Sequence, residues 1–361
     1  MKHKTLIFFV IGLAIMGVML YFIGINEVIG AFKLANIWFV LLAIAMQILT
    51  YYLFAVRWNI VNKTADINVG IKELLAMTLV GMAINNTTPS GRVGGEPVKA
   101  YILSKKTDNL YEETFATVIA DRALDTFPFI LLAVMSIIAM ILYFSLSTIV
   151  LLILIISVIV MTIAFTIVIY MSINEKAGEK IKKWIVKLIW FFYKKVSLEK
   201  LEERVIKAIS GFQKTMNSML HDKKILYYAL PLSFIIWVTE ILRVFLIFLA
   251  FGATVDPIII GVVFIVASLV GMIPLLPGGL GAVDGFMIVF YSSAGIPPSI
   301  SAAATLIERM ISFGMTSTIG LVILSHYGSN ILDKIKNKGI NEEETAKEIV
   351  EELDYIEERD K

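Results

Sequence analysis

Seven arginines occur in the chain, and five of them lie in hydrophobic or glycine-rich stretches, whereas nearly all the lysines lie in polar segments. These five are Arg57, Arg92, Arg122, Arg243 and Arg309. Arginine keeps its charge and presents a planar fork of donors that suits phosphate or carboxylate. A charge inside a bilayer costs about 2.5–3.5 kcal/mol on insertion scales. The arginines therefore indicate either recognition of an anion or structural pairs with acids three residues away, such as Arg122 with Asp125 and Arg243 with Glu240. We favour recognition.

Two loops rich in glycine and proline each place an acid seven residues after a proline. The first is PSGRVGGE, from Pro89 to Glu96, and the second is PGGLGAVD, from Pro277 to Asp284. Where such a loop leads into a helix, free backbone N–H groups and the helix dipole attract anions. With arginines nearby, we expect the loops to contact an anionic head group, phosphate first. The alternative is that the glycines only let the chain turn and pack closely.

The charged residues around the two loops recur in the same order. An acid–arginine dipeptide follows each loop acid, because Asp121 lies 25 residues after Glu96 and Glu308 lies 24 residues after Asp284. An arginine also precedes each loop proline, by 32 residues in the first case and 34 in the second. This recurrence predicts an internal duplication. The candidate substrate-binding residues are Arg57, Arg92, Gly94, Gly95, Glu96, Asp121, Arg122, Arg243, Gly278, Gly279, Asp284, Glu308 and Arg309.

The composition is that of a membrane protein. Of the 361 residues, 58% are hydrophobic and 17% are charged, and the mean hydropathy is +0.82. Soluble domains are about half apolar and a quarter charged, so disorder, a nucleic-acid module and an ordinary soluble enzyme are excluded. Cysteine is absent and only three histidines occur, so we expect no metal site and no cofactor. No nucleotide-binding loop occurs, which argues against ATP-driven transport.

The long hydrophobic stretches predict an all-α polytopic membrane helix bundle. A crossing takes about 20 residues, and suitable stretches occur at 5–25, 36–56, 114–143, 148–173, 225–251 and 299–326. Shorter runs flank the two loops, at 71–84, 98–106, 257–273 and 286–294. Two short helices around an irregular loop are typical of a re-entrant hairpin, whose backbone must be satisfied by protein or a water-filled cavity. Whether 257–273 crosses fully stays open.

The charge distribution predicts the orientation. Segment 174–224 carries 13 Lys and Arg against 6 Asp and Glu, so it should lie in the cytoplasm as an amphipathic segment on the membrane surface. With re-entrant hairpins both termini are then cytoplasmic. Three crossings separate repeat units of about 36–145 and 225–326, which inverts one unit relative to the other, as in many transporters. We expect residues 1–326 to form the transmembrane domain and 327–361 an acidic cytoplasmic tail.

Four segments together carry a family resemblance: TPSGRVGGEPVKAYIL, ADRALDTF, PLLPGGLGAVDG and LIERMISF. The chain resembles the flippase-like transmembrane region of lysylphosphatidylglycerol synthases, the multiple peptide resistance factors, in its stand-alone form. The resemblance covers roughly residues 5–326 and implies about eight helices, counting re-entrant hairpins, that handle or translocate a charged lipid. Only about 35 residues follow the last span, so the synthases' aminoacyltransferase activity is not carried over. Asp284 stands where glutamate is expected, which preserves the acid.

We therefore expect a multi-pass protein of the cell membrane that binds and translocates an anionic lipid or a lipid-linked sugar. Its expected partners are membrane lipids or polyprenyl-phosphate lipids, with a lipid-modifying enzyme or a second copy of the chain also considered, and no nucleic acid. One alternative is a membrane enzyme or accessory subunit acting on polyprenyl-phosphate-linked substrates, with Glu96 and Asp121 as its reactive cluster. A small-solute transporter is another. No catalytic residue or domain is recognised, so enzymatic activity is not expected.

Overall fold

The computed structural model describes Tyr21 and residues 25–88, 94–144, 146–174, 198–253, 255–272 and 277–325. Within these residues the secondary structure is helical and includes no strand, which confirms the predicted all-α class. These ranges contain eleven α-helices, or nine when the two helices that flank each loop are counted as one hairpin, which is close to the expected eight. Residues 5–20, Arg92 and the acidic tail lie outside the described residues.

Five helical stretches in the described part are long and apolar enough to cross a membrane. They are α3 (Ile37–Thr64), α6 (Tyr111–Tyr143), α7 (Thr148–Ile173), the π-helical turn η1 (Ile225–Ala229) with α10 (Leu230–Ala250), and α13 (Pro298–Arg309), which continues through the π-helical turn η3 (Met310–Met315) to Ser325. Large apolar side chains are exposed along α7, including Ile149, Ile156 and Val160. Such a surface is suited to lipid rather than water.

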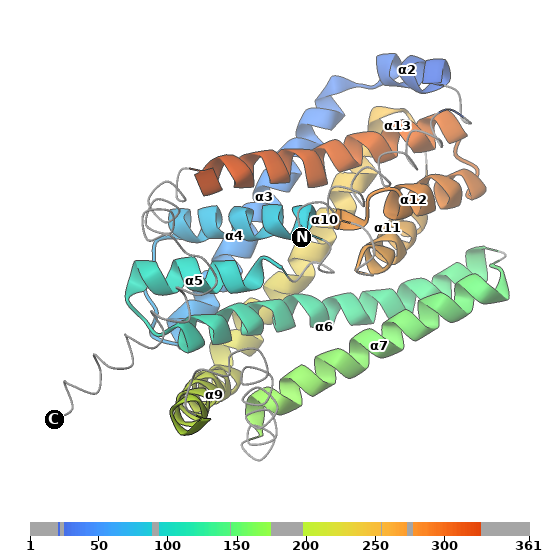
Figure 1. Cartoon of the computed structure of the whole chain (residues 1–361). Coiled ribbons are helices and arrows are strands. Elements are labelled where there is room, and N and C mark those ends of the chain that lie inside the picture. Colours follow the sequence, from blue (N-terminus) through green and yellow to red (C-terminus); the bar gives the residue numbers. More distant parts are fainter. Residues whose placement is uncertain are drawn as a thin grey trace.

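Side-chain caps fix the starts of several helices. Asn36 accepts the Trp38 N–H before α3, Ser147 accepts the Val150 N–H before α7, and Asp256 accepts the Ile258 N–H before α11 (Pro257–Gly271). Each cap satisfies a backbone donor that the first helical turn leaves free. Because Ser147 follows closely after the end of α6, helices α6 and α7 form a hairpin and lie side by side (Figure 1).

Four shorter helices flank the two loops. Helices α4 (Ile71–Thr87) and α5 (Glu96–Thr107) flank the first loop, and α11 (Pro257–Gly271) and α12 (Ala282–Ser293) flank the second, whose turn η2 spans Pro277–Gly279. At 1.5 Å per residue, α5 and α12 are about 18 Å long, which is too short for a core of about 30 Å. Helix α11 is about 22 Å long and is buried along most of its length.

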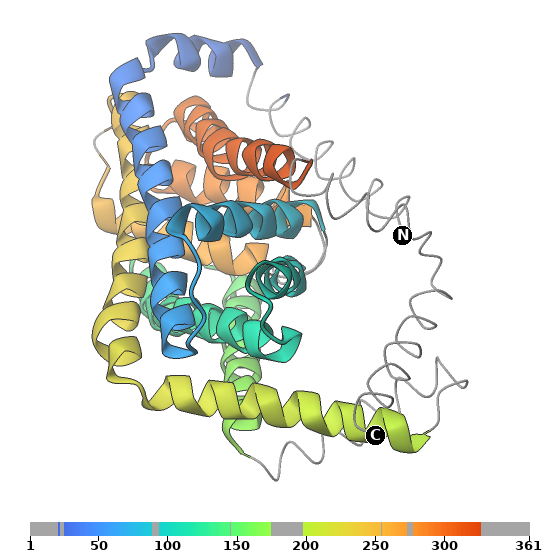
Figure 2. The same ribbon diagram turned by 90° about the vertical axis from the view of Figure 1, so that its left-hand side faces the viewer.

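Helices α3 and α10 pack against each other and form one side of the bundle (Figure 2). Helix α2 (Ile25–Leu34) lies across one end of this pair, and α9 (Leu198–His221) lies across the other (Figure 2). The α9 residues Met216 and Met219 are buried in a hydrophobic cluster with Trp58 of α3. The described part of segment 174–224 is thus a helix whose apolar side is packed on the bundle.

Candidate functional site

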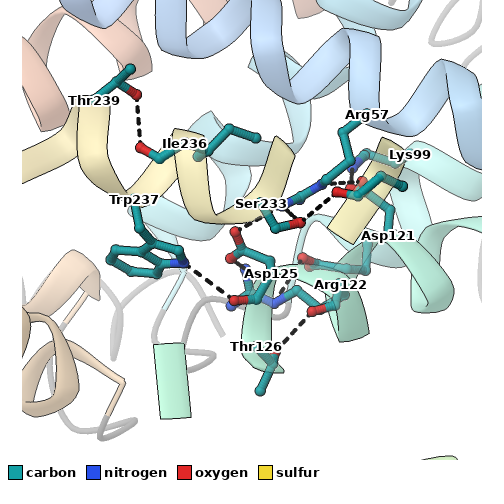
Figure 3. A network of polar contacts seen from close by, with 12 residues as sticks. Arg57, Lys99, Asp121, Arg122, Asp125, Thr126, Ser233, Ile236, Trp237 and Thr239 are labelled. Atoms are coloured by element: carbon teal, nitrogen blue, oxygen red, sulfur yellow. Dashed lines mark hydrogen bonds and ion pairs between the residues drawn. The ribbon is translucent and has the colours of Figure 1, made fainter. Parts of the chain in front are cut away.

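The first ion-pair cluster lies where α3, α5 and α6 meet, and it consists of Arg57, Glu96, Lys99, Asp121, Arg122 and Asp125. The buried Arg57 donates from Nε to Asp121 Oδ1 at 2.8 Å and from Nη1 to Asp125 Oδ1 at 3.1 Å (Figure 3). Lys99 Nζ lies 3.7 Å from Asp121 Oδ2 and 4.2 Å from the centroid of the Trp58 ring. These contacts compensate both carboxylates with cations.

Arg122 is held more loosely in the first cluster. Its Nη1 donates to Asp125 Oδ2 at 3.4 Å, and its Nε lies 3.9 Å from Glu96 Oε1. Both distances are long for charge-assisted hydrogen bonds, which are typically 2.7–2.9 Å. Its side chain is 29% exposed, against 1% for that of Arg57. Arg122 therefore keeps donor capacity that the cluster does not use.

The second ion-pair cluster lies where α10, α12 and α13 meet, and it consists of Glu240, Arg243, Asp284, Glu308 and Arg309. Arg243 is fully buried and donates to Glu240 Oε2 at 2.7 Å and to Glu308 Oε1 at 2.9 Å. Arg309 donates from Nε to Asp284 Oδ1 at 2.6 Å and from Nη2 to the Gly278 carbonyl at 2.9 Å. Every contact here is shorter than those of Arg122.

The two clusters use equivalent partners. In each, the arginine of the first long helix pairs with the acid of the dipeptide, and the arginine of the dipeptide lies against the loop acid. Arg57 also donates to Ser233, ten residues before Arg243, and Arg243 donates to Gln47, ten residues before Arg57. This reciprocity requires α3 and α10 to pack antiparallel about an approximate two-fold axis. The sequence indicated only the local pairs three residues apart.

The two loop acids differ in how well their carboxylates are satisfied. Asp284 is buried, and its second oxygen, Oδ2, accepts the Gly281 N–H at 2.7 Å. Glu96 is 5% exposed, but Asn85 Nδ2 approaches its Oε1 only at 3.5 Å, and its Oε2 is buried without a hydrogen-bond partner among the described residues. An unsatisfied buried polar atom is costly. Glu96 is therefore the less well compensated loop acid.

A cavity of about 180 Å³ lies between the two clusters. Its charged lining comes from both of them and consists of Arg122, Asp125, Glu240, Arg243, Glu308 and Arg309. A second cavity of about 70 Å³ adjoins it through Phe54, Met82 and Asn85 and reaches Glu96. Among the described residues, five cations and five acids line the two cavities together, so the formal charge of this described lining is balanced.

Eight of the predicted site residues line these cavities: Arg57, Glu96, Asp121, Arg122, Arg243, Gly278, Glu308 and Arg309. Gly94, Gly95, Gly279 and Asp284 line neither of the two. A Cβ atom at Gly95 would overlap the Gly81 backbone, and Gly278 has a φ of +57° with the Phe313 ring against it. These two glycines thus permit close packing, which is the alternative that the sequence left open.

Several cavity residues were not among the predicted site residues. The sequence favours a salt-bridge role for Asp125 and Glu240, and it indicates no role for Lys99 or Gln47. Lys99 lies one helical turn after Glu96 on α5, and Gln47 is a lone amide in an apolar stretch of α3. Gln47 carried a signal, since an isolated polar side chain in an apolar helix needs a partner, whereas Lys99 lies in a helix with several other charged residues. Among the residues that the structure describes, no cluster of His, Cys, Asp or Glu is suited to a metal ion.

These features define a polytopic helical membrane protein with a charged interior cavity. The chain matches the family described as the lysylphosphatidylglycerol synthase TM region over residues 9–320, and it belongs to this family. A UPF0104 membrane protein of Methanothermobacter thermautotrophicus is 50% identical over 94% of this chain and 100% of its own length. UPF0104 membrane proteins of Pyrococcus horikoshii and Methanocaldococcus jannaschii are each 30% identical, over 89% and 93% of this chain and 96% and 98% of their own lengths.

Proposed function

We propose that the protein binds an anionic lipid or a lipid-linked sugar by its head group and moves it across the membrane. The observation that carries this proposal is the cavity of about 180 Å³, which is lined by ion pairs from both clusters and lies within a bundle that is apolar outside. A lipid combines the two chemistries, because its head group suits the charged cavity and its chains suit the apolar surface. Membrane phospholipids and polyprenyl phosphates both have this form.

Arg122 is the proposed principal ligand of the head group. Its side chain is the most exposed of the four arginines in the clusters, at 29% against 11% for Arg309 and 1% for both Arg57 and Arg243. Its two ion pairs are also the longest that any of these arginines makes. A guanidinium with free donors can bind a phosphate through two parallel hydrogen bonds. Arg309 helps to shape the same cavity from the opposite unit.

The two clusters support an inverted-repeat mechanism. Helices α3 and α10 pack antiparallel, and each loop is followed by a helix too short to cross the membrane, α5 or α12. In this proposal both loops enter the membrane as re-entrant hairpins, and both termini are cytoplasmic. The two repeat units rock about a fixed central site, as in other inverted-repeat transporters. Cysteines introduced at Lys105 and Thr148, both exposed, should react with a membrane-impermeant reagent only from the cytoplasmic and outer sides, respectively.

Native mass spectrometry of the purified protein tests the lipid-binding proposal. The wild type should retain a phosphate-bearing lipid, and Arg122→Leu should lose it while remaining folded. Lys105→Leu is a matched control, because it removes an exposed cation of the neighbouring helix α5 that lines neither cavity. Equal lipid occupancy in Arg122→Leu and the control would contradict the proposed site. Movement is then measured with a fluorescent lipid analogue in reconstituted vesicles.

A further inference from the structure

The charge balance of the cavities sets a condition on any anion that enters them. Of the residues that the structure describes, five cations and five acids line the two cavities, and each arginine among them already lies against at least one acid. An anionic head group would therefore leave a net negative charge within a low-dielectric bundle. Such an imbalance is costly. Either a cation must enter with the anion or one of the acids must take up a proton.

Glu96 is the acid with the least compensation. Asp121, Glu240 and Glu308 each accept a hydrogen bond of 2.7–2.9 Å from an arginine. Asp125 contacts two arginines, at 3.1 and 3.4 Å. The nearest cation in the described contacts of Glu96 lies at 3.9 Å, and its Oε2 has no hydrogen-bond partner among the described residues. A proton on Glu96 would therefore cost the fewest existing contacts.

The groups around Glu96 connect its charge to Arg122. Glu96 lines the smaller cavity together with polar and charged side chains from four helices. These are Arg57 of α3, Asn85 of α4, Lys99 of α5, and Asp121, Arg122 and Asp125 of α6. Arg57 and Lys99 are already engaged by Asp121, so the cation that a neutral Glu96 would release is Arg122. Arg122 also lines the larger cavity, where the head group is proposed to bind.

We infer that Glu96 is a proton-binding site that couples uptake of one proton to binding of one monoanionic phosphodiester head group at Arg122. This inference rests on the proposed function and adds the ion that accompanies the lipid. The proton adds to a carboxylate oxygen of Glu96, and the Arg122 guanidinium then pairs with the phosphodiester instead. A negative charge next to a carboxylate favours its protonated form. By linkage, protonation must strengthen anion binding to the same extent.

Binding of dihexanoyl phosphatidylglycerol to the full-length protein in detergent tests the inference. Its phosphodiester keeps one negative charge between pH 6 and 8, so a pH effect reports on the protein. Calorimetry in two buffers of different protonation enthalpy gives the protons taken up per lipid. We expect uptake of about one proton per lipid for the wild type at pH 7.5, and the coupling of one proton to one lipid then makes the Kd rise about tenfold per pH unit. Dimethyl phosphate, which lacks acyl chains, should show the same slope at lower affinity.

Glu96→Gln is the decisive variant because it imitates the protonated side chain with nearly the same shape. It should bind phosphatidylglycerol at least about tenfold more tightly than the wild type at pH 8, with no pH slope and no proton uptake. Glu73→Gln is the matched control, since it neutralises a partly exposed acid on α4 that pairs with Lys106 and lines neither cavity. The control should keep the wild-type slope.

The outcomes separate this inference from the proposed function. If the wild type binds the lipid without taking up a proton, or Glu96→Gln keeps the full pH slope, the coupling is wrong and lipid binding stands. If the wild type binds neither phosphatidylglycerol nor dimethyl phosphate at any pH between 6 and 8, the proposed function fails, and the coupling fails with it.

Discussion

The two ion-pair clusters share one plan but differ in how firmly they are held. In the second cluster the loop acid Asp284 accepts hydrogen bonds of 2.6 and 2.7 Å from Arg309 and the Gly281 N–H. In the first cluster the equivalent Glu96 and Arg122 stand 3.9 Å apart. Short contacts hold Asp284 and the Gly278 carbonyl against Arg309 of α13, whereas the long contact leaves Arg122 able to exchange Glu96 for another partner. On the proposed function, the second cluster supports the fold and the first cluster binds the head group.

Residues at equivalent positions explain part of this difference. One turn after the loop acid stands Lys99 in the first unit and Met287 in the second, and one turn after the dipeptide arginine stands Asp125 in the first and Ser312 in the second. The first cluster therefore has a cation on α5 and an acid on α6 that the second lacks, whereas the second has Glu240 where the first has Phe54. The extra acid of the first cluster lies beside Arg122, which divides its contacts between two acids.

The largest expected effect is on stability, and it comes from the buried arginine that each cluster contains. Arg57→Leu and Arg243→Leu each remove the shortest ion-pair contact of a buried acid, Asp121 and Glu308 respectively, and loss of one member of a buried ion pair costs about 3–5 kcal/mol. Both variants should unfold at a much lower temperature in detergent, or fail to accumulate, whatever lipid is present. Adding Asp121→Asn and Asp125→Asn to Arg57→Leu should recover part of the lost stability. Wild-type melting of either single variant would show that the ion pairs are not structural.

The second-largest expected effect is on lipid binding, and we expect it in the first cluster and not in the second. Arg122→Leu removes the loosely held guanidinium, and a charge-assisted hydrogen bond is worth about 1.5–3 kcal/mol, so binding of phosphatidylglycerol should weaken about ten- to a hundredfold. Arg122→Lys should recover only part of the affinity, because it cannot make the bidentate contact. Arg309→Leu should instead lower the melting temperature first, because Asp284 loses its cation. If both leucine variants weaken binding equally at unchanged stability, the proposed division of roles is wrong.

A smaller effect compares the loop acids directly through stability. Asp284→Asn should cost about 1–2 kcal/mol, because two charge-assisted hydrogen bonds become neutral ones. Glu96→Gln should change the free energy of unfolding by less than about 0.5 kcal/mol, since the carboxylate has no short contact to lose. Thermal or denaturant unfolding of the two proteins at pH 8 measures the difference. A larger loss of stability in Glu96→Gln than in Asp284→Asn would contradict the weaker ion pairing of Glu96 in the first cluster.

The smallest expected effect concerns Lys99, the cation without an equivalent in the second unit. Lys99→Met places at this position the residue type that the second unit carries there. It removes an ion pair of 3.7 Å and a contact with the Trp58 ring, each worth less than about 1 kcal/mol at this geometry. Phosphatidylglycerol binding should weaken about two- to fivefold, which is the expected range for such energies. A loss as large as that of Arg122→Leu would make Lys99 a direct ligand.

Much of the architecture could be predicted from the sequence because it depends on local patterns. The apolar stretches gave four of the five long helices to within a few residues at most ends, since a bilayer requires about 20 apolar residues in a row. The predicted span 36–56 is the exception, because α3 continues to Thr64 and carries Arg57 inside the helix. The recurrent spacing of Glu96 with Asp121 and of Asp284 with Glu308 also identified residues that the structure brings into two similar clusters.

Only the tertiary structure decided which charges pair. The sequence indicated contacts three residues apart, such as that of Arg122 with Asp125, because a helix places those residues on one face. The pairs of Arg57 with Asp121 and of Arg243 with Glu308 join residues 64 and 65 positions apart. The crossed contacts to Ser233 and Gln47 depend on the antiparallel packing of α3 and α10. Such distances are set by how helices pack in three dimensions, and spacing along one chain carries no information about them.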